Sequence, residues 1–165
     1  MKKGMPHMEF TEQPMRPPQE AHSLLPRATQ GCTYNGCRFC YVSKGYPFMA
    51  VTPDQLEREI LAQKQFFPDD TPIYMTGSNP FALPAEKLKT YLAVLRKHLR
   101  HFTRVSMQSR INDIAGKNMA DLRELYGLGL SHLYIGTENG NDAVLTLMNK
   151  GHSASETVEQ LLRLD

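Results

Sequence analysis

The sequence predicts an α/β fold built on a parallel sheet. Three short apolar runs, which suit buried strands, begin near residues 73, 104 and 132. Each run is followed by a stretch with the apolar spacing of a helix. The runs recur at about the spacing of a βα unit, so parallel pairing with right-handed crossovers is the expected arrangement.

The N-terminal part divides into an arm and the start of a domain. Residues 1–20 are rich in Met, Pro, Gln and Glu without an apolar period, so we expect an extended or disordered arm. One domain is expected over residues 21–165, because a chain of 165 residues with 41% hydrophobic residues buries one ordinary core. A first short strand is expected at residues 24–28, broken or placed at an edge by Pro26.

Sequence patterns typical of helices lie between the expected strands. Thr52-Pro53-Asp54-Gln55 combines a capping hydroxyl, a proline at the first helical position and a glutamine three residues on, which predicts a helix to about Phe66. The strongest signal lies behind Pro84, where apolar residues recur at helical spacing. These residues are Leu88, Tyr91, Leu92, Leu95, Leu99 and Phe102.

The same alternation continues to the end of the sequence. A helical stripe begins at Met119 and ends at Gly127 or Gly129. Residues 133–136 form the fourth expected strand, and Ser153-Ala154-Ser155-Glu156 is a capping box before a last apolar stripe. The sequence therefore predicts about four βα units.

The net charge and the hydropathy of the sequence limit the classes of function that we expect for this protein. The formal net charge of +2 is too small to indicate a nucleic-acid binder by itself, and no run is long enough to span a membrane. No secretory signal follows Lys2 and Lys3, so we expect a cytoplasmic protein. Basic residues gather on the helix behind Pro84, where a solvated outer face is favoured over a nucleic-acid interface. They are Lys87, Lys89, Arg96, Lys97 and Arg100, with Arg104 after them.

Three cysteines lie within nine residues, at Cys32, Cys37 and Cys40. Thiolates are soft ligands that favour iron-sulfur clusters or zinc. Because a cubane has four irons, three protein ligands leave one iron open to a small molecule. Gly36 gives the loop backbone freedom, and Phe39 is placed to shield a cluster from water. The open alternatives are a zinc site completed by a histidine such as His22, and three unligated cysteines.

At this loop the sequence resembles the radical SAM superfamily, in which a three-cysteine loop follows the first strand of a partial (β/α)6 barrel. Phe39 and Cys40 fit its aromatic residue before the last cysteine. The spacing Cys-x4-Cys-x2-Cys is similar to that of a largely uncharacterised subgroup. The resemblance covers about residues 16–165 and includes three further segments. These are Arg16-Pro17-Pro18-Gln19-Glu20-Ala21, Gly136-Thr137-Glu138-Asn139-Gly140 and Asn149-Lys150-Gly151.

The resemblance implies two cofactors and an enzyme. Cys32, Cys37 and Cys40 would hold a 4Fe-4S cluster, and the amino and carboxylate groups of S-adenosylmethionine would bind its open iron. An electron, from a donor such as flavodoxin or ferredoxin, would split the sulfonium into methionine and a 5'-deoxyadenosyl radical. That radical would abstract hydrogen from a substrate that the sequence does not identify.

The resemblance also places a first group of site residues. Phe39 is expected near the adenine. Gly77, Ser78 and Asn79 stand where the family has a Gly-Gly-Glu-like segment that contacts the methionyl amino group. Only the first glycine is kept, and Asn79 offers an amide oxygen in place of the acid. A turn before a helix is an equal interpretation.

Two polar residues on the third strand and one just past the fourth complete the expected site. Ser106 and Gln108 alternate onto one side of the third strand, where they could reach the ribose hydroxyls or carboxylate of the cofactor. A satisfied barrel interior is the favoured alternative for both. Glu138 lies in a segment similar to the family's Gly-x-Glu-Ser-Gly, and its carboxylate is expected to bind S-adenosylmethionine or substrate. Its alternative role is to cap a helix that begins near Asn141.

The family fold implies six βα units, whereas the sequence supplies about four. We therefore expect a partial (β/α) barrel with an unpaired edge strand and a half-open cavity. Truncation at the C-terminus is the favoured explanation, and it predicts a poorly soluble or oligomeric isolated chain. The alternatives are a partner chain that completes the barrel, and a non-catalytic relic that holds an iron-sulfur cluster or zinc.

Overall fold

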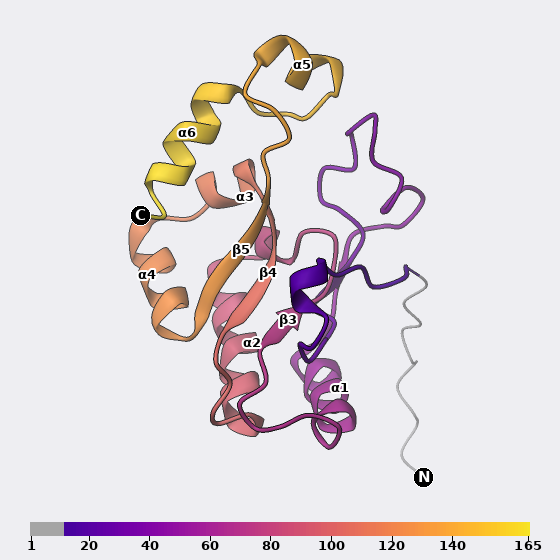
Figure 1. Ribbon diagram of the computed structural model, residues 1–165, viewed down its shortest axis with the longest axis vertical. Helices are drawn as coiled ribbons and strands as arrows, with labels where there is room; N and C mark the ends of the chain where they lie inside the picture. The colour runs from indigo at the N-terminus through magenta and orange to yellow at the C-terminus, as the bar shows by residue number, and fades with distance from the viewer. Residues whose placement is uncertain (1–11) are drawn as a thin grey trace.

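A three-stranded parallel sheet forms the centre of the computed structural model, which describes residues 12–165 (Figure 1). Its strands are β3 (Ile73–Met75), β4 (Val105–Arg110) and β5 (Leu130–Gly136), in the order β3-β4-β5. β4 is parallel to both neighbours. The predicted α/β class with parallel strands is therefore confirmed.

The first expected strand is present only as an interrupted ladder beside β3. Isolated parallel bridges join Leu24 to Ile73 and Arg27 to Thr76. Between them Pro26 accepts a bond from the Thr76 amide at 2.9 Å but has no N–H to donate, so the ladder stays discontinuous. The chain then forms a short antiparallel pair, β1 (Thr29–Gln30) and β2 (Met49–Ala50), which the sequence did not predict.

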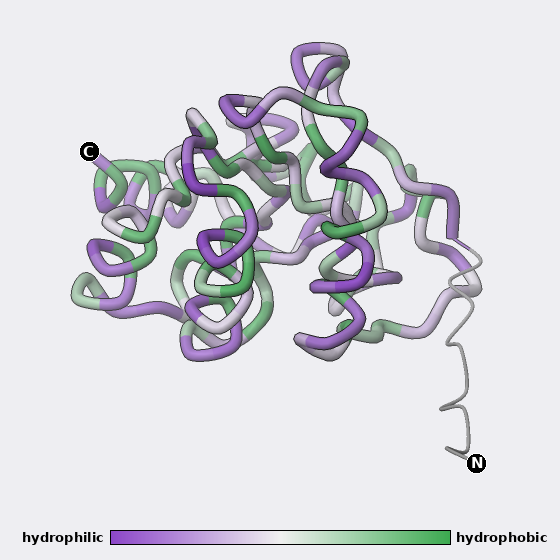
Figure 2. The backbone as a smooth tube through the Cα atoms, turned by 90° about the horizontal axis from the view of Figure 1, so that it is seen from below, coloured by the Kyte–Doolittle hydropathy of each residue, from purple (hydrophilic) through white to green (hydrophobic). Residues whose placement is uncertain are grey.

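Six α-helices and two 3-10 turns connect the strands in the described part of the chain. The Thr52 capping box forms as predicted, with Gln55 N–H donating to Thr52 Oγ1 at 3.2 Å and Thr52 N–H to Gln55 Oε1 at 2.7 Å. Figure 2 shows hydrophobic and hydrophilic stretches alternating along the helical turns. The elements are η1 (Pro18–Glu20), α1 (Pro53–Lys64), η2 (Pro80–Ala82), α2 (Ala85–His98), α3 (Ile111–Ala115), α4 (Met119–Gly127), α5 (Asp142–Leu147) and α6 (Ala154–Leu162).

Two predicted helices end early in the structure, and α1 does so at Lys64 rather than near Phe66. α2 ends at His98 rather than near Phe102, because Leu99 adopts an extended backbone with φ of −128°. The short helix α3 was not predicted, since five residues are too few to show a helical period, whereas α5 begins after Asn141, where a helix was expected. Ser153 caps α6 through the predicted capping box.

The hydrophobic core is well packed on the side of the sheet nearest α1 and α2. Side chains of these helices and of β3 and β4 join in one cluster and are fully buried. They include Leu56, Ile60, Ile73, Met75, Leu88, Leu92, Leu95, Val105 and Met107. Burying each of these apolar side chains contributes about 1.5–3 kcal/mol to folding.

The β5 side is less covered. β5 pairs with β4 alone among the described strands, so it is an edge strand as predicted. The exposed apolar side chains on the nearby helices include Leu147 (68% exposed), Val158 (58%) and Leu162 (68%). Within residues 12–165, no helix is both long and apolar enough to cross a membrane.

The N-terminal segment departs from the expected arm, whereas the basic face of α2 agrees with the favoured interpretation. Residues 1–11 of the expected arm lie outside the described residues, but Glu12 and Glu20 are buried against the domain. On α2, Lys89 forms ion pairs with three carboxylates and Lys97 forms one with Glu57 at 2.7 Å. These ion pairs support the interpretation of the basic face of α2 as a solvated outer face.

Candidate cofactor site at the cysteine loop

The cysteine loop starts at a position that only glycine fits. Gly31 has φ of +70°, and a Cβ there would lie 2.5 Å from the Pro47 carbonyl oxygen. The loop brings three free thiols to one cavity. Cys37 is buried, whereas Cys32 and Cys40 are partly exposed.

The segment after α5 holds the outer side of this loop. The Tyr34 hydroxyl donates to the Asn149 carbonyl at 2.9 Å, and the Asn149 amide nitrogen donates to the Gly36 carbonyl at 2.8 Å. Arg38 N–H donates to the Met148 carbonyl at 2.9 Å. Residues more than a hundred positions apart therefore fix the loop's conformation.

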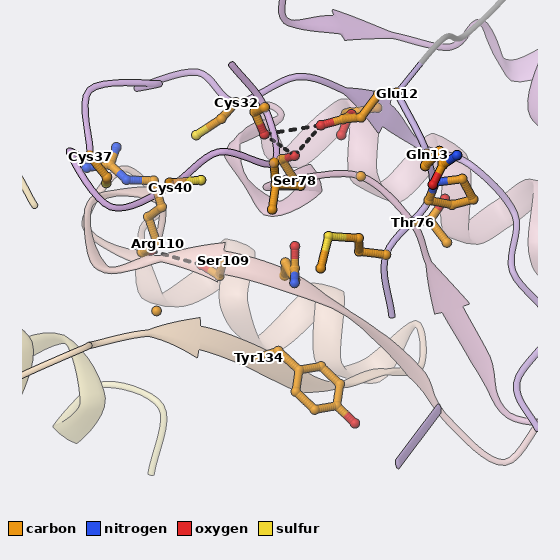
Figure 3. Close-up of a pocket in the computed structure, with 18 of the residues that line it drawn as sticks. Glu12, Gln13, Cys32, Cys37, Cys40, Thr76, Ser78, Ser109, Arg110 and Tyr134 are labelled. Carbon is orange, nitrogen blue, oxygen red and sulfur yellow. Dashed lines mark hydrogen bonds between the residues drawn. The ribbon is translucent and has the colours of Figure 1, made fainter. Parts of the chain in front are cut away.

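The cavity lies at the carboxyl ends of the parallel strands and has a volume of about 230 Å³ (Figure 3). Gly77 and Ser78 after β3, Gln108 on β4 and Glu138 after β5 line it together with the thiols. In open parallel sheets this edge is where ligands bind. The topology thus brings the cysteine loop and three strand ends to one place.

Two cations and an anion border the thiols. Lys150 is 5% exposed, and its ammonium lies 2.7 Å from Glu138 Oε1. Gly136 leaves room for this pair, because a Cβ there would lie 2.9 Å from both Glu138 Oε1 and Lys150 Nζ. Burial raises the pKa of the Cys37 thiol, and the positive charges of Lys150 and Arg110 act against that rise. The Arg110 guanidinium stacks over the Tyr34 ring at 4.0 Å.

The family profile described as the Radical SAM superfamily matches residues 27–164 of this sequence. The chain belongs to that superfamily. Radical SAM proteins use a 4Fe-4S cluster and S-adenosylmethionine. No curated protein matches the sequence significantly.

Solved structures similar to this radical SAM chain have the same fold. They include the cobalamin-dependent S-adenosylmethionine radical enzyme OxsB with aqua-cobalamin and S-adenosylmethionine bound, at a TM-score of 0.70 and 19% identity over 86% of this chain. The SeMet-labelled apo form of OxsB matches at a TM-score of 0.69 and 19% identity over 86% of this chain. This chain spans 22% of the OxsB chain in both matches. The predicted partial barrel is thereby confirmed as a fold.

Most of the predicted site residues line the cavity. Phe39, Gly77, Ser78, Gln108 and Glu138 do so. The Gln108 amide lies against the carbonyl oxygens of Gly77 and Ser78 at 3.1 and 3.0 Å, so its nitrogen faces them. Glu138 has φ of +61° and does not cap the following helix, because the side chain of Asn141 performs that role.

The structure keeps Asn79 and Ser106 away from the cavity lining. The Asn79 amide oxygen accepts from Thr33 N–H at 3.2 Å, and its nitrogen donates to Asp113 Oδ2 at 3.1 Å, so it anchors the cysteine loop to α3. The Ser106 hydroxyl donates to the carboxylate of Glu20 at 2.8 Å. The satisfied interior foreseen as an alternative therefore describes Ser106.

Sequence reasoning gave no role to three charged residues at the cavity. Lys150 lies within a segment that carried the family resemblance, which was the available signal. Arg110 ends a strand that already carries several polar residues, so one more is unremarkable. Glu12 belongs to a segment without any periodic pattern. Only tertiary contacts reveal that Arg110 and Glu12 border the cavity.

The donor set fits an iron-sulfur cluster better than a single zinc ion. Within residues 12–165, no group of three His, Cys, Asp or Glu side chains converges to hold one ion. The cysteines of a cubane bind different irons, so their sulfurs need not converge on one point. His22, the fourth ligand in the zinc alternative, is exposed and does not line the cavity.

Proposed function

We propose that this chain holds a 4Fe-4S cluster on Cys32, Cys37 and Cys40, binds S-adenosylmethionine beside it and cleaves that cofactor reductively. The position of the three thiols carries the proposal, because all of them line one cavity at the carboxyl ends of parallel strands. When bound, the cluster supplies the electron that splits S-adenosylmethionine into methionine and a 5'-deoxyadenosyl radical, which abstracts hydrogen from a substrate.

Lys150 and Arg110 give the cysteine side of the cavity its positive charge. Both lower the pKa of the Cys37 thiol against the effect of burial, which favours the thiolate form that binds iron. The same cations are suited to a ligand carboxylate, since charge-assisted hydrogen bonds are stronger than neutral ones. We assign the carboxylate of S-adenosylmethionine to this side.

Apolar and backbone groups form the remaining walls. Phe39 is 48% exposed beside Cys40 and offers a ring face for the adenine. At Gly77, whose φ is +139°, a Cβ would lie 2.1 Å from Thr29 Oγ1, so any other residue would displace this wall. Gln108 then holds the carbonyl groups of that wall in place.

The proposal implies an electron donor and a reducing compartment. A small reduced protein such as a flavodoxin or ferredoxin is the class of donor that suits a cluster near a surface cavity. Three free thiols persist in a compartment such as the cytoplasm, where disulfides are rare.

Electron paramagnetic resonance of anaerobically reconstituted, reduced protein tests the proposal. The expected result is a 4Fe-4S signal that changes when S-adenosylmethionine is added, because the ligand binds the cluster directly. A variant in which all three cysteines are replaced by Ala is the control and should give no signal. A cluster signal that S-adenosylmethionine leaves unchanged would contradict cofactor binding, and zinc in place of iron would contradict the cluster.

A further inference from the structure

The outer side of the cysteine loop carries two exposed cations and no acid. Residues 31–51 contain Arg38 and Lys44 but neither Asp nor Glu. Both side chains are exposed, and neither forms an ion pair with a residue that the structure describes. They donate to backbone carbonyls instead, Arg38 to that of Leu147 at 3.2 Å and Lys44 to that of Asn35 at 2.6 Å. The loop therefore presents to solvent two positive charges that no described side chain pairs with.

A large aromatic side chain lies in the same part of the loop. Tyr41 directly follows Cys40 and is 81% exposed. Lys44 N–H donates to the Tyr41 carbonyl at 3.4 Å, so the aromatic residue and the cation belong to one turn. Leu147, whose carbonyl accepts from Arg38, is exposed as well. We call Arg38, Tyr41, Lys44 and Leu147 the loop face. Exposed apolar side chains bordered by charges are typical of protein–protein contact sites.

The loop face lies next to the proposed cluster ligands but outside the cavity. Each of its three loop residues is within four positions of a cysteine. None of its four residues lines the cavity, whereas all three thiols do. In the proposed function the cavity holds S-adenosylmethionine when the cluster receives its electron, so an electron carrier needs another approach. The outer side of the loop gives that approach, because the same loop carries the thiols.

We propose that the loop face is the docking site of an acidic electron-carrier protein of the flavodoxin type. This inference rests on the proposed function, and it gives the electron donor a place on the chain. One electron passes from the anionic flavin hydroquinone, which becomes the neutral semiquinone, to the 4Fe-4S cluster, whose charge falls from 2+ to 1+. No bond forms or breaks, and no proton moves. Redox proteins meet through small contact areas, and opposite charges steer them together.

Two other occupants fit the loop face less well. RNA binding depends on many phosphate contacts and needs a larger set of cations than two. A second copy of the chain, docked about a two-fold axis, would bring like charges of the two copies together. An acidic protein surface complements both Arg38 and Lys44 and leaves Tyr41 to pack between them and the carrier.

Stopped-flow mixing of reconstituted protein with flavodoxin hydroquinone tests the inference, because semiquinone formation reports electron transfer. The variant Arg38→Glu/Lys44→Glu reverses both charges. The rate constant of the wild type should fall as salt is added, since salt screens the attraction. The variant should be about tenfold slower at low salt, and its rate constant should rise with salt. A change in loop conformation alone would not invert the salt dependence.

Matched controls separate the place of the charges from their number. Arg58→Glu/Lys64→Glu changes the net charge equally, but both residues are exposed on α1, at the other end of the molecule from the cysteine loop (Figure 1). This variant should keep nearly the wild-type rate constant. Iron content and the extent of reduction by dithionite should be the same in all proteins.

A binding measurement gives a second result that needs no electron transfer. Dye-labelled oxidised flavodoxin, followed by fluorescence anisotropy at low salt, should bind the wild type more tightly than Arg38→Glu/Lys44→Glu. Tyr41→Ala should also weaken binding, but it should leave the salt dependence as in the wild type because it changes no charge.

The outcomes that contradict the inference differ from those that contradict the proposed function. Equal rate constants of the wild type and Arg38→Glu/Lys44→Glu at low salt, or reduction by dithionite but not by flavodoxin, would overturn the inference. Loss of RNA binding or of self-association in that variant, with electron transfer unchanged, would assign the loop face to RNA or to a second copy and would overturn it as well. Protein that takes up no 4Fe-4S cluster would instead refute the proposed function.

Discussion

The two halves of the sheet interior use polar groups in opposite ways. Toward the amino ends of the strands, Glu20 is fully buried and accepts from Ser106 at 2.8 Å and Tyr134 at 2.7 Å, and Arg104 pairs with it. Ser23 also donates to it. We call these five residues the Glu20 network. At the carboxyl ends, cysteines and charged residues face a cavity instead.

The difference separates stability from binding. In the Glu20 network the carboxylate accepts from four side chains, so the network stabilises the fold, and only Tyr134 among its members also lines the cavity. At the cavity, thiols and charges lack such complete internal pairing, which is costly unless a ligand completes it. Substitutions in the two regions should therefore change different measurements.

The largest expected effect is at the cysteines. Replacing Cys37 by Ser should abolish stable cluster binding, because a hydroxyl is a poor ligand for iron where a soft thiolate is needed. Far-ultraviolet circular dichroism of the unreconstituted protein should be almost unchanged, since the core at α1 and α2 lies elsewhere. Iron content per chain is the decisive measurement, and near-wild-type iron in Cys37→Ser would remove this residue from the ligand set.

Next in size is the loss of the Glu20 carboxylate. Glu20→Ala should lower the free energy of unfolding by about 3 kcal/mol, because it leaves a partly buried Arg104 and buried hydroxyls without their acceptor. Urea unfolding measures this. If the variant were as stable as the wild type, the Glu20 network would not stabilise the fold, and the proposed difference between this network and the cavity would be wrong.

The stability contribution of Glu20 should also depend on pH. Burial by itself raises the pKa of Glu20, but hydrogen bonds from Ser23, Tyr134 and Ser106 and the charge of Arg104 hold the pKa below its ordinary value. A carboxyl whose pKa is lower in the folded state stabilises the protein above about pH 4.5 and loses that effect as pH falls through its folded pKa.

Urea unfolding of wild-type protein and Glu20→Gln between pH 6 and pH 3 tests this linkage. The stability difference between the two proteins should shrink as the pH falls, because protonation removes the charge that the variant already lacks. A difference that stays constant over this range would show that the charge of Glu20 does not stabilise the fold.

The sequence predicts the local features of the fold and of the site, but it does not predict their long-range contacts. Apolar periods and capping boxes predicted the strands and the long helices, because those signals are local. The cysteine loop was predicted from an equally local signal, the spacing of its three cysteines. The contacts of Glu12 and Glu20 join residues 66 and 86 positions apart, and no pattern within either segment encodes them. The pair β1 and β2 was missed because two-residue strands show no alternation.

At the cavity, Lys150→Met should affect binding more than stability. Losing the cation should weaken S-adenosylmethionine binding by about tenfold, as expected for one charge-assisted hydrogen bond. Lys150→Arg is the control, because it keeps the charge and should retain most of the affinity. Equal affinities of all three proteins in equilibrium dialysis would take Lys150 out of the cofactor site.

The smallest expected effect comes from Ser106, for which the sequence offered a cofactor contact but favoured a satisfied interior. Ser106→Ala removes one of several donors to Glu20 and should cost about 1 kcal/mol of stability while leaving S-adenosylmethionine affinity unchanged. Gln108→Ala, two residues along the same strand, should do the reverse, because its amide supports the cavity wall at Gly77 and Ser78. If Ser106→Ala weakened cofactor binding as much as Gln108→Ala, β4 would act as one functional surface. The binding region would then extend along β4 as far as Ser106, toward the amino end of the strand.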